Sequence, residues 1–126
     1  MKQGKYIISK RFDFCASHCL EGLRADHPCR RIHGHNYQII VELEKTELDD
    51  VGMVRDYRAL SVIKEWFDTV WDHQHLNSIS LMNGINPTAE NIARVVYNQV
   101  RNYIPEVVAV TVKETDKTAA RYERRF

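Results

Sequence analysis

The chain has 126 residues, of which 44% are hydrophobic and 28% are charged, and its formal net charge is +1. This size and composition predict a single compact domain over residues 1–126, and the balanced charge argues against nucleic acid as a partner. The apolar runs are too short and too charged to predict a membrane span, and Lys2 to Lys5 do not begin a charged-then-apolar leader. We therefore expect a cytoplasmic protein without a membrane partner, for which a small anionic substrate remains possible.

The first two predicted elements are strands joined by a loop. Residues Tyr6 to His18 alternate in character, and residues 20–31 lose this periodicity around Gly22 and Pro28, which predicts the loop. A second strand is predicted from His33 to about Glu44, because large side chains at odd positions alternate there with polar ones. The more apolar side of the first strand carries Phe12, Phe14, Ala16 and His18.

Two helices are predicted in the middle of the chain. A turn at residues 50–53 precedes Asp56, which can cap an amphipathic helix over residues 57–71. A polar cluster at residues 72–77 follows. Thr88 can cap the second predicted helix, and Pro105 ends this helix. The apolar stripe of this helix contains Ile92, Val95, Val96, Val100 and Tyr103.

The chain ends with two further predicted strands. In the first, Glu114 is in phase with three valines of residues 108–114, so its carboxylate is expected to point inward or into a cleft. Residues 115–118 form the turn into a strand over residues 119–126. The order β-β-α-α-β-β predicts an α+β fold, with a four-stranded antiparallel sheet and both helices on one face. Its open edges predict a symmetric homo-oligomer in which several sheets close a barrel.

A candidate metal site begins the second strand. His33 and His35 project from one face of that strand, roughly 6.6 Å apart at the backbone. His18 is in phase on the neighbouring strand, and three histidines are one standard ligand set of catalytic zinc. Two alternatives to a metal site remain: His33 and His35 could be incidental strand residues, and His18 could be a histidine of the core. A cupin site would need a carboxylate where Gln38 and Ile39 stand.

Three further residues are candidates for proton transfer. Cys29 lies just before the histidine pair, where a nearby cation would favour its thiolate as a base or nucleophile, although it could instead be a small buried hydrophobic residue. Asp72 beside His73 can position an imidazole that relays protons near neutral pH. The three cysteines form no C-x-x-C pair, which argues against a disulfide framework, and we expect Cys15 and Cys19 to be small buried hydrophobic residues.

Taken in order, these motifs resemble the 6-pyruvoyl-tetrahydropterin synthase family over nearly the whole chain. The three residues between Cys29 and His33-Gly34-His35 are similar to the 6-carboxy-tetrahydropterin synthase branch, which belongs to queuosine and 7-deazapurine biosynthesis. Asn36-Tyr37 also occurs in the biopterin branch, and Cys15 stands where the family often has serine. The motifs are Phe12-Asp13-Phe14-Cys15-Ala16-Ser17-His18, Cys29-x-x-x-His33-Gly34-His35, Asp72-His73, Pro87-Thr88-Ala89-Glu90-Asn91 and Val112-Lys113-Glu114-Thr115.

The resemblance implies a tunnelling fold, in which three subunits close a barrel, two trimers stack into a hexamer and the active sites lie between subunits. It also implies Zn²⁺ on His18, His33 and His35. Cys29 would be the proton-abstracting base, supported by His73 and Asp72. The pterin ring would be anchored by Glu114, helped by Thr88 and Glu90.

The implied reaction converts 7,8-dihydroneopterin triphosphate to 6-carboxy-5,6,7,8-tetrahydropterin, with release of acetaldehyde and triphosphate. Basic residues at the rim, such as Arg24 or Arg30, are candidates for holding the triphosphate. Two alternatives remain: the pyruvoyl-forming synthase of the same family, and a pterin-binding protein that keeps the fold without turnover.

Overall fold

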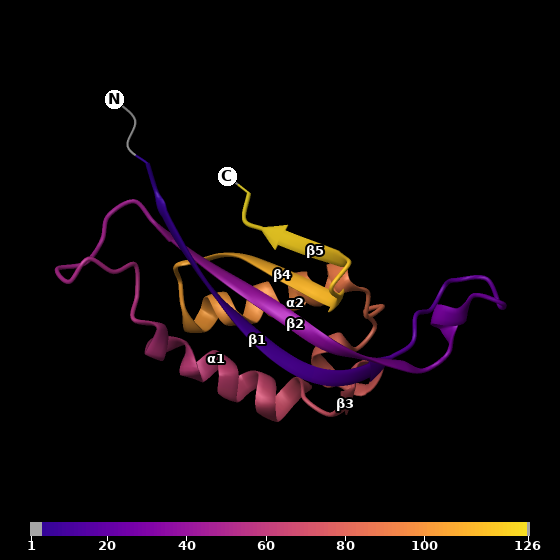
Figure 1. Ribbon diagram of the computed structural model, residues 1–126. Helices are drawn as coiled ribbons and strands as arrows, with labels where there is room; N and C mark the ends of the chain where they lie inside the picture. Colours follow the sequence, from indigo (N-terminus) through magenta and orange to yellow (C-terminus); the bar gives the residue numbers. More distant parts are fainter. Residues whose placement is uncertain (1–3, 126) are drawn as a thin grey trace.

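The computed structural model describes residues 4–125, and its framework is one long β-hairpin. Strands β1 (Tyr6–His18) and β2 (His33–Lys45) pair antiparallel along their full length, and His33 lies opposite His18 at the loop end. The loop between them contains a 3₁₀ turn at Pro28–Arg30 and extends beyond the sheet (Figure 1). The predicted bounds of the first strand are confirmed, and the second strand is one residue longer than predicted.

The sheet has five strands, so the prediction of four is wrong. β4 (Val107–Thr115) pairs with β2 and β5 (Thr118–Glu123) pairs with β4, both antiparallel, which gives the order β3-β1-β2-β4-β5. The additional strand is β3 (Gln74–His75), which runs parallel to β1 beside Ala16 and Ser17. It has only two residues, too few to produce an alternating pattern. The predicted fourth strand ended at Phe126, which lies outside the described residues.

The first predicted helix consists of three successive hydrogen-bonding patterns. A 3₁₀ turn at Tyr57–Leu60 leads into α1 (Ser61–Trp66), and a π-helical turn at Phe67–Trp71 completes it. Asp56 caps the first turn as predicted, because its side chain accepts a hydrogen bond from the Arg58 N–H. Tyr57, the first residue of the predicted amphipathic helix, is 51% exposed, since the 3₁₀ turn rotates it away from the core.

The second predicted helix is confirmed as α2 (Ala89–Tyr103), capped by Thr88. Its stripe is buried from Ile92 to Val100, whereas Tyr103 at the last turn is 37% exposed. Two short 3₁₀ turns, Leu76–Ser78 and Ser80–Met82, connect β3 with α2. Both helices pack on the sheet face that carries Phe12, Phe14, Tyr37 and Ile39, so the core has one layer of helices on one layer of strands (Figure 1).

Cys15 in β1 and Cys19 just after it are not part of this core, which corrects the prediction that both are small buried residues. Cys15 is exposed and Cys19 is partly exposed. The reason for Cys15 is the strand period: Phe14 and Ala16 point to the helices, so the residue between them points to the open face of the sheet. There its Sγ donates to Asn36 Oδ1 on the neighbouring strand, at 2.9 Å.

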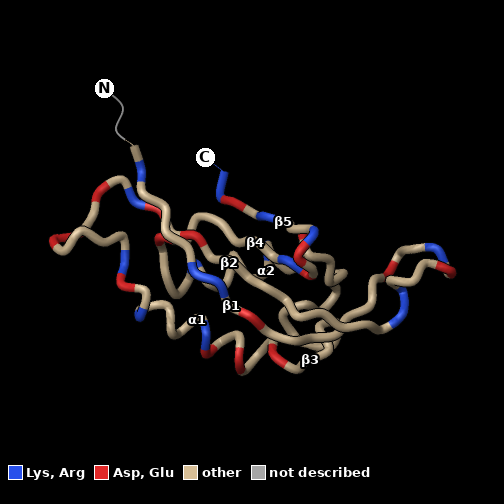
Figure 2. The backbone as a smooth tube through the Cα atoms, viewed as in Figure 1, with Lys and Arg blue, Asp and Glu red and all other residues tan. Residues whose placement is uncertain are grey.

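Acidic and basic residues are interspersed along the chain, including the tip of the loop between β1 and β2 (Figure 2). Among the described residues, no helix has the length and apolar character that crossing a membrane requires.

Candidate metal centre

Three predicted ligands meet where β1 ends and β2 begins. The hairpin register places His18 opposite His33 and places His35 one side chain further along the same face. One ligand atom from each of the three lies within 4.8 Å of the others, which is a separation that one metal ion can bridge. His18 is fully buried, whereas His33 and His35 are partly exposed, so the centre opens at one side.

Backbone carbonyls orient two of these rings. The Nδ1 of His18 is 2.8 Å from the carbonyl oxygen of Pro87, and the Nδ1 of His33 is 2.7 Å from that of Arg31. A carbonyl oxygen only accepts, so we assign the ring hydrogen to Nδ1 in both cases. The lone pair of a neutral ring is then on Nε2. Hydrogen bonding of the distal ring nitrogen in this manner is typical of metal-ligating histidines.

Glu114 completes the polar environment of the centre. Its Oε2 is 3.2 Å from Nε2 of His18 and 3.3 Å from Nε2 of His35. Neither contact has the geometry of a hydrogen bond, and both ring nitrogens are buried without a partner among the described residues. Two unpartnered ring nitrogens beside a carboxylate are a suitable environment for a cation. The sequence prediction that Glu114 points inward is confirmed.

The titration of these groups reflects their proximity. The contact with His18 lowers the pKa of Glu114 below its ordinary value, against the opposing effect of burial. Burial lowers the pKa of His35 and so favours its neutral form. A metal ligand must be a neutral imidazole, so burial of His35 supports this role.

The start of α2 lies beside the centre. Glu90 and Glu114 line a cavity of about 350 Å³ together with Val112, Ala120 and Arg121. Thr88, the third residue predicted to help bind the pterin, accepts a hydrogen bond from Asn91 N–H at 3.2 Å as the N-cap. The structure therefore brings Glu90 and Glu114 to one cavity, while Thr88 is the N-cap residue of α2.

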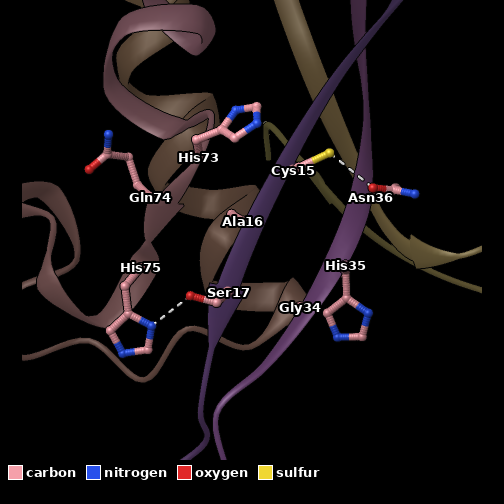
Figure 3. A pocket seen from close by; sticks show the side chains of 9 residues that line it. All are labelled: Cys15, Ala16, Ser17, Gly34, His35, Asn36, His73, Gln74 and His75. Atoms are coloured by element: carbon pink, nitrogen blue, oxygen red, sulfur yellow. Dashed lines mark hydrogen bonds between the residues drawn. The ribbon is translucent and has the colours of Figure 1, made fainter.

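Asp72 and His73 lie at the edge of β1 that pairs with β3, and the His73 side chain lies beside Cys15 (Figure 3). Asp72 Oδ1 accepts from the Cys15 N–H at 2.9 Å, and His73 N–H donates to the Cys15 carbonyl at 2.6 Å. Asp72 Oδ2 is 2.8 Å from Nδ1 of His73. The Cys15 N–H lowers the pKa of Asp72 most, and His73 lowers it further. His73 has a left-handed backbone, with φ of 59°, and its side chain is 80% exposed.

His73 borders an open cavity of about 640 Å³, which Cys15, His35, Asn36 and His75 also line (Figure 3). Ser17 Oγ and His75 Nδ1 are 2.9 Å apart and connect the side chains of two strand partners.

Cys29 is held by its backbone in the loop between β1 and β2. Its N–H donates to His27 Nδ1 at 3.1 Å, and its carbonyl accepts from Leu20 N–H at 2.8 Å. The side chain is partly exposed. In residues 4–125, no hydrogen bond or ion pair joins Cys29 to Asp72 or His73. Within one copy, the predicted base and the predicted proton relay are therefore not joined by a hydrogen bond in the described residues.

The two arginines proposed for the triphosphate are both exposed in this loop. Arg24 pairs with Asp26, with 3.5 Å between Nε and Oδ1. Arg30 is the last residue of the 3₁₀ turn.

Several residues around the site were not found by sequence reasoning. Tyr37 was predicted only as a large strand residue, yet its hydroxyl is 3.1 Å from Nδ1 of His18. Asn77 and Asn86 bind the backbone just after His18. Asn86 before Pro87 was recognised only as a helix start signal, and no local pattern distinguishes Asn77.

A five-stranded sheet with two covering helices and three converging histidines defines an α+β protein with a candidate metal centre, and comparison with known proteins identifies its family. The family model described as 6-pyruvoyl tetrahydropterin synthase matches residues 7–125. The chain belongs to this family, as its motifs predicted.

Two curated relatives cover most of the chain. The 6-carboxy-5,6,7,8-tetrahydropterin synthase of Synechocystis sp. is 35% identical, and the match covers 93% of this chain and 92% of that protein. The protein of the same name from Bacillus subtilis is 31% identical, and the match covers 87% of this chain and 80% of that protein. The predicted similarity to enzymes of this name is thereby confirmed.

Solved structures share the fold. The 6-pyruvoyl tetrahydropterin synthase of Caenorhabditis elegans superposes with a TM-score of 0.86 at 24% identity, over 99% of both chains. An uncharacterized protein from Wolinella succinogenes superposes with a TM-score of 0.81 at 25% identity, over 98% of this chain and 100% of that chain.

Proposed function

We propose that this chain is a zinc-dependent lyase that converts 7,8-dihydroneopterin triphosphate to 6-carboxy-5,6,7,8-tetrahydropterin, with release of acetaldehyde and triphosphate, in queuosine biosynthesis. The observation that carries this proposal is the centre of His18, His33 and His35, whose ligand atoms converge within 4.8 Å in a chain of this family. The name and coverage of the relatives favour the carboxy-forming reaction.

The residues present fit a zinc ion. Zinc prefers neutral imidazole nitrogens, and the carbonyls of Pro87 and Arg31 leave Nε2 of His18 and His33 free to supply them. When bound there, zinc supplies Lewis acidity toward oxygen atoms of the substrate side chain.

Proton transfer is assigned to Cys29 and His73. Cys29 acts as the base that abstracts a proton from the substrate side chain. Asp72 accepts a hydrogen bond from Nδ1 of His73, which leaves Nε2 of that exposed ring to deliver or accept a proton.

Recognition of the pterin ring is assigned to Glu114, Thr88 and Glu90. The pyrimidine edge of a pterin presents two N–H donors side by side, like a guanidine, and a carboxylate can accept both. The low pKa of Glu114 keeps it ionised for this purpose. Its position against two ring nitrogens would bring the ring of the substrate next to the metal.

A complete site requires more than one copy in this proposal. Cys29 lies in the loop between β1 and β2 and His73 lies just before β3, and no hydrogen bond joins them in the described residues. Among the described strands, β5 and most of β1 each have one unpaired edge, and pairing of such edges between copies is the usual route to a barrel. We propose a hexamer of two trimers, with sites between subunits.

Product identification tests the reaction. Purified protein is incubated with 7,8-dihydroneopterin triphosphate, and the pterin and acetaldehyde are quantified by mass spectrometry. We expect 6-carboxytetrahydropterin and acetaldehyde in equal amounts. A pyruvoyl product without acetaldehyde would instead identify the other activity of the family.

A pterin-binding protein without turnover is the remaining alternative. Cys29→Ala is the discriminating variant, because it removes the base and leaves the three histidines in place. We expect loss of turnover with the zinc content unchanged, measured by inductively coupled plasma mass spectrometry. Turnover equal to that of the wild type would contradict the assignment of Cys29. Wild-type protein with far less than one zinc per chain would contradict the metal centre itself.

A further inference from the structure

The segment just after the metal ligand His18 continues β1 without a strand beside it. β3 ends its pairing with β1 at Ser17, and two asparagine side chains take over on the same edge. Each amide binds both the N–H and the carbonyl of one residue, as a neighbouring strand would do.

Asn77 forms the first of these double hydrogen bonds. Its Oδ1 accepts from Cys19 N–H at 3.0 Å, and its Nδ2 donates to the Cys19 carbonyl at 2.9 Å. Asn77 is two residues beyond β3, so its side chain extends the edge that β3 begins.

Asn86 forms the second. Its Oδ1 accepts from Glu21 N–H and its Nδ2 donates to the Glu21 carbonyl, both at 3.0 Å. Because Asn86 precedes Pro87, the same dipeptide holds Glu21 through one residue and Nδ1 of His18 through the other.

The residue between the two bound positions faces the other way. In extended backbone, Cys19 and Glu21 direct their polar groups to one edge and Leu20 to the opposite edge. Leu20 N–H donates to the carbonyl of Cys29 at 2.8 Å and so closes the base of the loop. Asn77 and Asn86 therefore fix the strand segment on which Cys29 is held.

We propose that Asn77 and Asn86 are positioning residues, which hold Cys29 in register with the histidine centre by pairing with both sides of Leu20. This inference rests on the proposed function, in which Cys29 is the base. Displacement of a catalytic group by about 1 Å can lower a rate by about a hundredfold, so the effect of releasing this segment is large enough to measure.

The test uses the full chain with Asn77→Ala, Asn86→Ala and the double variant. We expect hydrogen exchange of the Leu20 amide, followed by NMR, to accelerate at least tenfold in the double variant, because two hydrogen bonds on each side of Leu20 are lost. We expect kcat to fall about ten- to a hundredfold, with KM changed less than threefold and the zinc content unchanged. Asn98→Ala is the matched control, because Asn98 lies exposed on α2 and has no hydrogen bond from its side chain in the described residues.

Asn86→Asp serves as a second variant in case the alanine variants fold poorly. It keeps the acceptor for Glu21 N–H and loses the donor to the Glu21 carbonyl, so we expect a kcat between those of the wild type and Asn86→Ala. Unchanged Leu20 exchange in the double variant, or accelerated exchange with wild-type kcat, would overturn the proposal.

The rate at which iodoacetamide alkylates Cys29 distinguishes this proposal from the proposed function. It is measured with Cys15→Ser and Cys19→Ser present, so that a single thiol reacts. If wild-type protein forms no pterin product, the proposed function fails, whereas a several-fold change of this rate in the double variant still supports the positioning of Cys29. An unchanged rate would contradict it.

Discussion

His18 connects the metal centre to the core, because it is the only charged or polar residue with a fully buried side chain among the core residues of the described chain. Its Nδ1 is close to two oxygens, the carbonyl of Pro87 and the hydroxyl of Tyr37. Because the Pro87 carbonyl only accepts, the ring hydrogen lies on Nδ1, and the Tyr37 hydroxyl oxygen is a second acceptor for it. Burial raises the pKa of Tyr37 most, so its phenol stays neutral. The ring of His18 thus has one orientation in which Nε2 faces the other histidines.

Tyr37→Phe tests this arrangement. We expect zinc affinity to fall by up to about tenfold, because one of two partners of the His18 Nδ1–H is lost while the phenyl ring keeps its packing against Phe14. Affinity is measured by competition with a chromophoric chelator. Tyr97→Phe is the matched control, since the Tyr97 hydroxyl is also buried but lacks a partner among the described residues. Equal zinc affinity of Tyr37→Phe and wild type would contradict this role.

At the scale of elements, the end of the first helical segment determines where the proton relay lies. The π-helical turn places Phe67 and Trp71 against Phe14 of β1, with ring centroids at 5.6 and 5.7 Å. Asp72 N–H then donates to the Phe67 carbonyl, and the next residue, His73, takes a left-handed backbone. This reversal delivers Asp72 and His73 to the β3 edge of β1, where both bond the backbone of Cys15. The burial of Phe67 and Trp71 against β1 therefore determines where Asp72 and His73 lie.

The turn between β2 and the first helical segment depends on the carboxylate of Asp49. Its Oδ1 accepts from the N–H groups of Val51 and Met53, both at 2.9 Å. The hydrogen bond from Met53 lowers the pKa of Asp49 most. A lowered folded-state pKa stabilises the fold above the unfolded-state value of about 3.9, and this stabilisation is lost as the pH falls through the folded-state pKa.

Asp49→Asn should therefore lower stability more at about pH 6 than at about pH 3. The measurement is the urea midpoint of both proteins at the two pH values, followed by circular dichroism. Asp50→Asn is the control, because it removes a neighbouring carboxylate for which no bond to the turn is present in the described structure. A stability difference between wild type and Asp49→Asn that does not shrink in acid would contradict the role of the ionised carboxylate.

At the scale of the whole molecule, one copy holds the parts of the proposed site at separate places on its sheet. The histidine centre is on the face that the helices cover, and Asp72 and His73 are at the β3 edge of β1, bonded to the backbone of Cys15. The loop with Cys29 projects beyond the sheet (Figure 1). Because Cys29, His73 and the histidines are separated within one copy, we propose that residues of different copies combine in one site.

Complementation tests whether the site is shared. Cys29→Ala and His73→Ala should each abolish turnover alone. Co-expression of the two should restore part of the activity, because a mixed oligomer contains some interfaces with one intact Cys29 and one intact His73. Native mass spectrometry of the mixture gives the oligomeric state, for which we expect a hexamer. Mixed oligomers without any recovered turnover would contradict a shared site. The control is co-expression of two Cys29→Ala chains with tags of different length, which should recover no turnover because every copy lacks Cys29.

The sequence alone determined the local features that follow from period and spacing. Alternation with period two fixed the bounds of β1, the shared face of His33 and His35, and the inward direction of Glu114. Cap and stop residues fixed the start and end of α2. These features depend on neighbours in the chain, so local patterns could predict them.

Only the tertiary structure decided which distant groups meet. β3 was missed because two residues become a strand only when β1 lies beside them. Asn77 and Asn86 were missed because their partners are 58 and 65 residues away and are backbone groups, which leave no pattern in a single sequence. The buried position of His18 was decided in the same way, by Pro87 and Tyr37. Side-chain hydrogen bonds across the fold depend on packing, and packing is a property of the complete chain.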